Sequence, residues 1–297
     1  MPNLLPSVLI GILWIATSAI SFFPAVYLET DIKWLKLAVL TSVPIMFLVT
    51  FPVMAGLLSW FGQKGIVRGS FPRELMHPVY FYRRIYGLLW TQLYYFKPIY
   101  TVVLAIPVLK KVVLRLFGYK YSTNFVVYPD TWIRDLPLLE IGAGAYLSNR
   151  ATLGSNICLQ DGSILVDKIR IGEKALIGHL CIVGPGCKIE SGAELGVHSA
   201  LGIRVNLKSG SSVKPECGIN HGSVIGENTS VGSRSHIGMR CIVGPNLKIP
   251  AGANIPNGSI LQFQRDVDDY YHSETKKLKE TVATVSELIA RYDEHVS

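Results

Sequence analysis

The stretch IGEKALIGHLCIVGPGCKIE (residues 171–190) carries the pattern that governs the middle of this chain. Aliphatic residues stand six apart in it, at Ile171, Ile177, Val183 and Ile189. Counting outward in both directions, every sixth residue from Ile141 to Leu261 is Leu, Ile or Val. The residue two places before each of these is mostly small or aliphatic, and the residue after it is often Gly.

A strict period of six is typical of a parallel β-helix. In a strand, residues i−2 and i point to the same side, so a small and a large side chain enter the core together. The glycine and polar residues that follow turn the chain into the next short strand. Three such hexads complete one triangular coil, so residues 139–262 are predicted to form a β-helix of about seven coils.

Two apolar segments precede the repeat. Residues 1–28 and 37–63 contain no charged side chain, and each exceeds the roughly 20 residues that cross a bilayer. The simplest interpretation is a transmembrane helical hairpin over residues 1–63. A cleaved signal peptide is the alternative for the first segment, but that segment lacks a basic start and is too long.

The net charge of +8 lies almost wholly before the repeat. From Lys64 to Lys120 the only acidic residue is Glu74. Because basic loops stay on the cytoplasmic side, the chain is expected in the inner (cytoplasmic) membrane with its repeat facing the cytoplasm. Basic charge beside apolar segments favours anionic membrane lipids, and not nucleic acid, as partners.

Residues 64–138 are predicted to contain basic, aromatic-rich interfacial or re-entrant helices and a linker. The run from Tyr80 to Tyr100 mixes Trp and Tyr with basic residues, a composition that settles at the level of lipid headgroups. The run from Ile99 to Phe117 is apolar but interrupted by Lys110 and Lys111. We therefore expect an interfacial or re-entrant helix there, with a third membrane crossing as the alternative.

Residues 263–297 are predicted to form a C-terminal amphipathic helix. Its apolar seam consists of Leu278, Val282, Val285, Ile289, Tyr292 and Val296, spaced alternately four and three apart. Such a seam is typical of a helix that packs on one side. It is expected to lie along the β-helix or to form a contact between subunits.

The cysteines indicate a reducing compartment. Four of the five occupy the small inward position of a hexad: Cys181, Cys187, Cys217 and Cys241. They are expected to be small buried hydrophobes, and Cys158 falls outside this position. Because neither disulfide nor metal-cluster spacing is present, we expect no structural disulfide and no resident metal.

Residues 18 apart stack on the same corner of a triangular coil. This register predicts Asp161 below His179, and Glu216 one coil beyond His198, all on one corner. A carboxylate beside an imidazole fixes the tautomer and stabilises the imidazolium after the ring takes a proton. The next corner carries His221, a third candidate base, and the remaining corner holds ordinary turn residues.

The segment IGHLCIVG (residues 177–184) resembles the stretch around the catalytic base of UDP-N-acetylglucosamine acyltransferase and of sugar O-acetyltransferases of the hexapeptide class. The resemblance implies a left-handed β-helix, an acyltransferase activity and the role of general base for His179. A second copy of the segment, residues 237–244, has Met239 in place of the histidine, so the repeat itself does not require His179. The usual Gly-Asn-Pro-Ala ending of the family is replaced here by residues 256–259, Pro-Asn-Gly-Ser.

A second resemblance covers roughly residues 62–261. A basic loop, a segment rich in Tyr, Arg and Trp and a Leu-rich helix precede the sequences LFGYK (116–120) and DLPLLEIG (135–142). This order is similar to that of the membrane-embedded hexapeptide region at the C-terminus of ε-poly-lysine synthetase. It implies membrane-attached acyl or aminoacyl transfer, without a particular substrate. The apolar hairpin and the basic, aromatic-rich segment favour a lipid-linked acceptor, and a glycan or peptide acceptor is also expected.

The hexapeptide resemblance also implies a homotrimer with a donor thioester in the groove between prisms. The donor would be acyl-CoA or an acyl or peptidyl carrier protein, since the sequence has no P-loop or dinucleotide fingerprint. Arg204, Arg240 and Lys248 would suit the phosphates of a pantetheine arm.

Two other functions compete with acyl transfer. The β-helix could be a noncatalytic scaffold that assembles a membrane complex. A γ-type carbonic anhydrase-like enzyme would bind zinc through three histidines at subunit interfaces, but it uses a His-x4-His pair that this sequence lacks.

Overall fold

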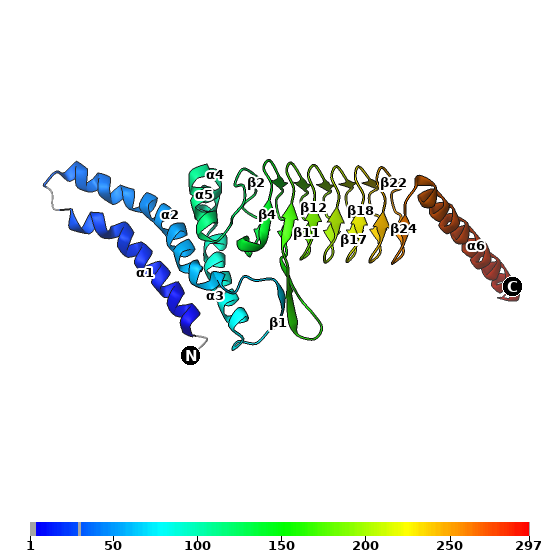
Figure 1. Ribbon diagram of the computed structural model, residues 1–297, viewed down its shortest axis with the longest axis horizontal. Helices are drawn as coiled ribbons and strands as arrows, with labels where there is room; N and C mark the ends of the chain where they lie inside the picture. Colours follow the sequence, from blue (N-terminus) through cyan, green and yellow to red (C-terminus); the bar gives the residue numbers. More distant parts are fainter. Residues whose placement is uncertain (1–3, 29–30, 297) are drawn as a thin grey trace.

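Two long antiparallel helices begin the chain, α1 (Leu4–Tyr27) and α2 (Lys33–Gln63) (Figure 1). The computed structural model describes residues 4–28 and 31–296. Both helices are long and apolar enough to cross a membrane, and only 17% of the most apolar window of each is buried by the rest of the chain. The core helix of a soluble protein would bury far more of its apolar surface, so these two helices fit the predicted hairpin.

Three shorter helices fill the space between this hairpin and the strands. They are α3 (Pro78–Tyr95), α4 (Lys97–Ala105) and α5 (Pro107–Leu116), and each has a proline at its start, where the missing N–H costs nothing. Both α3 and α5 pack on α2, and α4 packs on α5. The run from Ile99 to Phe117 is thus two short helices broken at Ile106, each too short to cross a bilayer alone. An interfacial or re-entrant position for this run, and the alternative of a third crossing, stay predictions.

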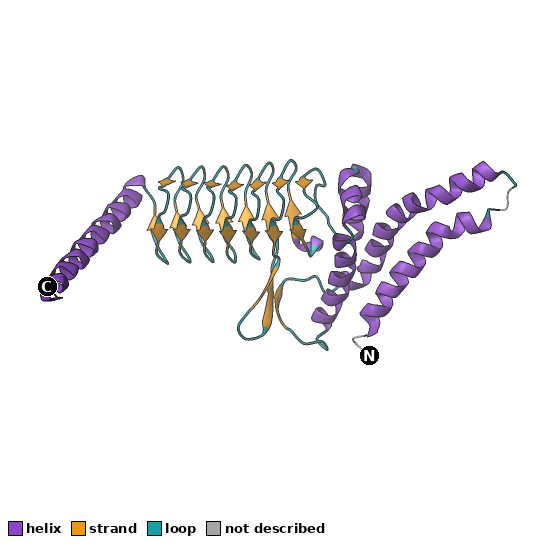
Figure 2. Cartoon of the chain, turned by 180° about the vertical axis from the view of Figure 1, so that it is seen from behind, coloured by secondary structure: helices purple, strands orange, loops and turns teal. Residues whose placement is uncertain are grey.

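Short strands stack into three parallel sheets of seven strands each, which form a triangular prism (Figure 2). The first sheet contains β2 (Val126–Val127), β5 (Tyr146–Leu147), β10 (Leu176–Ile177), β13 (Glu194–Leu195), β16 (Ser212–Val213), β19 (Ser230–Val231) and β22 (Lys248–Ile249). The second contains β3 (Trp132–Ile133), β6 (Thr152–Leu153), β11 (Ile182–Val183), β14 (Ala200–Leu201), β17 (Gly218–Ile219), β20 (His236–Ile237) and β23 (Asn254–Ile255). The third contains β4 (Leu139–Ile141), β9 (Ile169–Ile171), β12 (Lys188–Ile189), β15 (Asn206–Leu207), β18 (Val224–Ile225), β21 (Ile242–Val243) and β24 (Ile260–Leu261).

The predicted parallel β-helix is confirmed. We call the turns from first to second sheet the first corner, from second to third the second corner, and from third to first the third corner. Aliphatic residues of the hexads fill the prism, and the four cysteines at the small inward position are buried, as predicted. The Cys181 thiol donates to the Gly196 carbonyl at 2.9 Å, and the Ser223 hydroxyl donates to the Gly238 carbonyl at 2.6 Å. Small residues with a donor therefore satisfy the carbonyls of the next coil from inside the prism.

The prism departs from the predicted register in two places. It begins at Val126 instead of Leu139, because β2 and β3 pair with β5 and β6. Residues 154–168 then leave the prism as a hairpin of β7 (Asn156–Cys158) and β8 (Ser163–Val166), and β1 (Gly69–Pro72) pairs antiparallel with β8. The length of this excursion is a multiple of six. The aliphatic residues therefore remain six apart in the sequence, although the coil of the prism is interrupted.

The C-terminal helix α6 (Gln264–Val296) leaves the end of the prism and points away from it (Figure 1). Leu278, Val282 and Val285 are exposed, so this part of the seam does not lie along the β-helix. The side chains of Ile289, Tyr292 and Val296 lie outside the described part of the chain. A contact between subunits through this seam stays a prediction.

A buried carboxylate joins the helices to the prism. Asp135, just before the 3-10 helix η1 (Leu136–Leu138), is fully buried and has a left-handed φ of 56°. Its Oδ2 accepts hydrogen bonds from Arg83 of α3 and from the Ser155 hydroxyl at the start of the hairpin. One side chain thus ties together α3, the first coil and the hairpin.

Candidate functional site

His179 and His198 lie on the first corner in adjacent coils. The backbone N–H of His198 donates to the carbonyl of His179 at 2.9 Å. His179 is half-buried and His198 is exposed. The strand pairing that fixes this spacing is parallel and in register through β10 and β13, so the two histidines are held close by the rigid prism.

The residue below His179 is Asn149 and not Asp161. Ile177 pairs with Leu147 across β10 and β5, so Asn149 occupies the position of His179 one coil earlier. The Asn149 Oδ1 atom is buried and has no hydrogen-bond partner among the described residues. An amide oxygen placed there can accept a hydrogen bond from a neighbouring imidazole or from a substrate.

The predicted stacking of Asp161 under His179 is wrong because the hairpin interrupts the coil. Asp161 lies in the turn between β7 and β8, and its Oδ1 accepts the backbone N–H of Ser163 at 2.8 Å. Asn149 was missed for the same reason. One signal in the sequence was available: the hexad at Leu159 has the large Ile157 at its small position and no glycine after it.

Glu216 follows His198 by one coil, as the sequence predicts, but its carboxylate pairs with an arginine and not with the histidine. Leu195 pairs with Val213, which puts Glu216 in register with His198. The Glu216 Oε2 atom accepts a hydrogen bond from Arg234 Nε at 2.8 Å. Because both partners of this pair are largely exposed, the pair contributes little to stability, and in this arrangement it does not orient an imidazole.

Exposed apolar side chains border the two histidines. Leu176 and Ile182 stand on the outer faces of β10 and β11, and Leu180 and Val197 stand on the corner itself; all four are exposed. Exposed apolar side chains gathered around one corner are typical of a surface that binds an apolar ligand or another protein surface.

His221 lies on the second corner and caps the backbone. Its Nδ1 atom accepts the N–H of Ile203 at 2.8 Å, so the proton of the neutral ring lies on Nε2. No ring lone pair is then available to take a proton from a substrate. Asn257 makes the same contact two coils later, where its Oδ1 accepts the N–H of Met239 at 2.7 Å. The structure therefore gives His221 a structural role.

The three basic residues predicted to bind phosphates are not brought together. Arg204 and Arg240 lie two coils apart on the second corner, whereas Lys248 lies on β22 of the first sheet. Arg204 Nε lies 3.4 Å from Asp167 Oδ2, and the same carboxylate accepts Arg68 Nε at 2.7 Å. Burial tends to raise the pKa of Asp167, but hydrogen bonds from the backbone of Lys168 and from these arginines hold it below its usual value.

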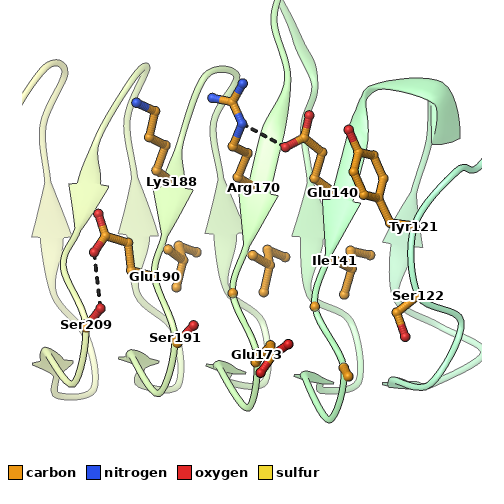
Figure 3. Close-up of a pocket in the computed structure, with 15 residues that line it drawn as sticks. Tyr121, Ser122, Glu140, Ile141, Arg170, Glu173, Lys188, Glu190, Ser191 and Ser209 are labelled. Atoms are coloured by element: carbon orange, nitrogen blue, oxygen red, sulfur yellow. Dashed lines mark hydrogen bonds and ion pairs between the residues drawn. The ribbon is translucent and has the colours of Figure 1, made fainter.

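A groove of about 860 Å³ lies on the third sheet and third corner (Figure 3). This corner was predicted to hold only ordinary turn residues. Glu140 pairs with Lys168 at 2.7 Å and with Arg170 at 2.8 Å, and Glu190 pairs with Lys208 at 2.9 Å. The charges along this groove mostly neutralise one another within the chain, and the groove contains no histidine. Within residues 4–28 and 31–296, no three His, Cys, Asp or Glu side chains are arranged to hold a metal ion.

No protein-family model matches the sequence, and no curated protein matches it. Several solved structures resemble the prism in part. A perosamine N-acetyltransferase from Caulobacter crescentus, solved with CoA and GDP-perosamine, has a TM-score of 0.33 and 17% identity over 52% of this chain and 62% of its own. The acetyltransferase domain of PglB from Neisseria gonorrhoeae, solved with acetyl coenzyme A, has a TM-score of 0.28 and 14% identity over 52% of this chain and 64% of its own.

A UDP-N-acetylglucosamine O-acyltransferase from Moraxella catarrhalis has a TM-score of 0.28 and 14% identity, over 46% of this chain and 63% of its own. In each of these three matches the chain covers less than two thirds of the neighbour's length. With identities and TM-scores this low, the likeness assigns no activity to this chain.

Proposed function

We propose that the chain is a membrane-anchored acyltransferase in which His179 is the general base. The observation that carries the proposal is the pair of histidines on one corner, His179 and His198, within the segment that resembles the base region of hexapeptide acyltransferases. Of the three candidate histidines, His221 already accepts a backbone N–H with its Nδ1 atom, so His179 and His198 remain as candidate bases. The apolar border of the corner supports an acyl or pantetheine ligand.

In the proposed reaction His179 takes the proton of an acceptor hydroxyl or amine as its oxygen or nitrogen attacks the thioester carbonyl. The tetrahedral intermediate then collapses, the C–S bond breaks, and the thiolate leaves. The proton on the imidazolium passes to this thiolate, so His179 ends the cycle neutral. Asn149, with its free amide oxygen one coil below, is proposed to orient the imidazole.

The donor is proposed to be acyl-CoA or a carrier-protein thioester, and the acceptor a lipid-linked or amphiphilic molecule. The two apolar helices support a position in the inner membrane, with the prism on the cytoplasmic side. We also propose a homotrimer, in which the groove between neighbouring prisms completes the donor site. The exposed seam of α6 supports such an assembly.

The test is transfer by the full chain, purified in detergent, from a panel of acyl-CoA donors to lipid extracts of the expressing cells. Consumption of donor and formation of acylated product are both followed by mass spectrometry. We expect His179→Ala to lower turnover roughly 10²- to 10⁴-fold, the usual contribution of a general base. The matched control is His236→Ala, because His236 is an exposed histidine on the outer face of β20.

Two results would change the assignment. If His198→Ala abolishes transfer and His179→Ala does not, the base is His198. If the wild-type chain transfers from no thioester, and cells carrying His179→Ala keep the wild-type phenotype, the chain is a noncatalytic scaffold.

A further inference from the structure

A pocket of about 340 Å³ lies outside the prism, where α3 meets the hairpin of β7 and β8. Four arginines from three separate segments line it: Arg73, Arg83, Arg84 and Arg134. None of the residues that line the pocket is acidic. We call it the arginine pocket.

Arg83 is built into the wall of this pocket with part of its guanidinium unpaired. Its side chain is only 6% exposed, and its Nη2 pairs with the buried Asp135. Its Nη1 atom is buried and has no hydrogen-bond partner among the described residues. Burial lowers the pKa of Arg83, which reports the cost of keeping this charge away from water.

Arg134 is placed in the pocket by a glycine of α3. A Cβ at Gly87 would lie 2.4 Å from Arg134 Nη2, so a side chain at this position would displace the guanidinium. Arg134 Nε lies 3.6 Å from Asp135 Oδ1 but makes no hydrogen bond to any described residue. The helix backbone and the arginine are thus fitted to each other.

The positive charge of the pocket exceeds the negative charge beside it. Asp135 is shared between Arg83 and Arg134, so these two guanidinium groups carry one positive charge more than the single carboxylate between them balances. A partly buried surplus of positive charge is costly unless an anion compensates it. Several guanidinium groups around one small pocket form the arrangement that binds phosphate oxygens best.

The arginine pocket lies near the C-terminal end of α2, where the apolar hairpin of α1 and α2 ends. A Cβ at Gly62 would lie 2.6 Å from the backbone N of Tyr86, and a Cβ at Gly65 would lie 2.4 Å from the backbone N of Arg83. These glycines let the end of α2 pack directly on the backbone of α3. They hold the backbone of Arg83 against Gly65, two residues beyond Gln63, the last residue of α2, where headgroups would meet a spanning helix.

We propose that the arginine pocket binds a phosphate-bearing anion, whether the headgroup of a membrane lipid or a free phosphate or pyrophosphate. The binding does not depend on acyl transfer, so it stands or fails independently of the proposed function.

Cys158 provides a direct readout, because it lines the pocket and is exposed while the other four cysteines are buried. The full chain is reconstituted in nanodiscs, and the rate at which iodoacetamide alkylates Cys158 is measured by peptide mass spectrometry. Inorganic pyrophosphate is added to nanodiscs of phosphatidylcholine, with sodium chloride at matched ionic strength as the salt control. In a parallel arm the nanodiscs contain phosphatidic acid and no pyrophosphate is added.

We expect an occupied pocket to slow the alkylation of Cys158. Arg84→Gln and Arg134→Gln, which avoid the buried Arg83–Asp135 pair, are each expected to weaken this protection roughly tenfold, the effect of one charge-assisted hydrogen bond. The matched control is Arg265→Gln, which should be protected like the wild type. Arg265 is the second residue of α6, and α6 follows the opposite end of the prism (Figure 1).

Protection by pyrophosphate identifies a site for free anions, and protection by phosphatidic acid alone identifies a headgroup site; either result supports the proposal. If neither slows alkylation, or if Arg84→Gln and Arg134→Gln are protected as fully as Arg265→Gln, the proposal is overturned.

Discussion

Replacing Asp135 by Asn tests whether the buried carboxylate holds the helices to the prism. Asp135 is fully buried, and its partner Arg83 is nearly so. The amide would leave the Arg83 guanidinium without a counter-charge, and breaking a buried pair in this way costs about 3–5 kcal/mol of unfolding free energy. Asn tolerates the left-handed φ of 56° at this position, so backbone strain adds little to the loss.

The assay is urea unfolding of the full chain in a mild detergent, followed by tryptophan fluorescence. Trp90 and Trp132 report on the joint between helices and prism, since the Trp132 ring lies 4.7 Å from that of Tyr94 of α3. The control is Asp130→Asn, which removes a solvent-exposed ion pair to Lys97 and should cost less than about 1 kcal/mol.

A second measurement separates lost charge from lost shape. Adding Arg83→Met to Asp135→Asn removes the unpaired guanidinium, so the double variant is expected to recover part of the stability lost by the single one. The reasoning fails if Asp135→Asn is no less stable than Asp130→Asn, or if the double variant loses the full sum of both single changes.

Three further predictions concern pH and packing. Burial lowers the pKa of Lys110 to about 8. Between pH 8 and 10.5 the unfolded chain therefore binds more protons than the folded chain, and the free energy of unfolding rises with pH by about 3 kcal/mol. Lys110→Met should abolish this rise in urea titrations. Burial opposes ionisation of Glu140, but hydrogen bonds from Lys168, Tyr121 and Arg170 lower its pKa to about 2. Its contribution to stability is therefore present above pH 4.5 and lost as the pH falls to 2, and thermal melts of Glu140→Gln should lack this acid loss; an unchanged acid profile would contradict the assignment. In Gly202→Ala the new Cβ would lie 2.4 Å from His221 Nδ1 and 2.9 Å from its backbone nitrogen. The imidazole must therefore leave Ile203 and the backbone must shift, at a cost of about 1–3 kcal/mol, and the His221 NMR signals should report a free Nδ1.

The β-helix and its core residues could be predicted from the sequence, because the same pattern of buried side chains recurs every six residues. Each hexad places one large and one small side chain inside the prism whatever its neighbours are, so Ile177, Cys181 and Val183 could be assigned to the core by counting. The apolar helices were equally visible, since crossing a bilayer requires a long run of residues without charge. His179 and His198 could be placed on one corner because no insertion falls between them.

Only the tertiary structure decided what stands beside these histidines. Counting by six cannot detect an excursion whose length is a multiple of six, so Asp161 took the place that belongs to Asn149. Long-range strand pairing reveals the excursion. The strand β1 pairs with β8 of the β7–β8 hairpin, and Ile141 pairs directly with Ile171.

The arginine pocket is also a product of tertiary contacts. Its four arginines come from the segment before α3, from α3 itself and from the first coil, and no spacing in the sequence relates them. They converge because glycines of α2 and α3 allow close packing and because Asp135 attracts Arg83 and Arg134 to one point. Periodic burial is local in the chain and is visible in the sequence; charge gathered from distant segments depends on how those segments pack, and only the fold reveals it.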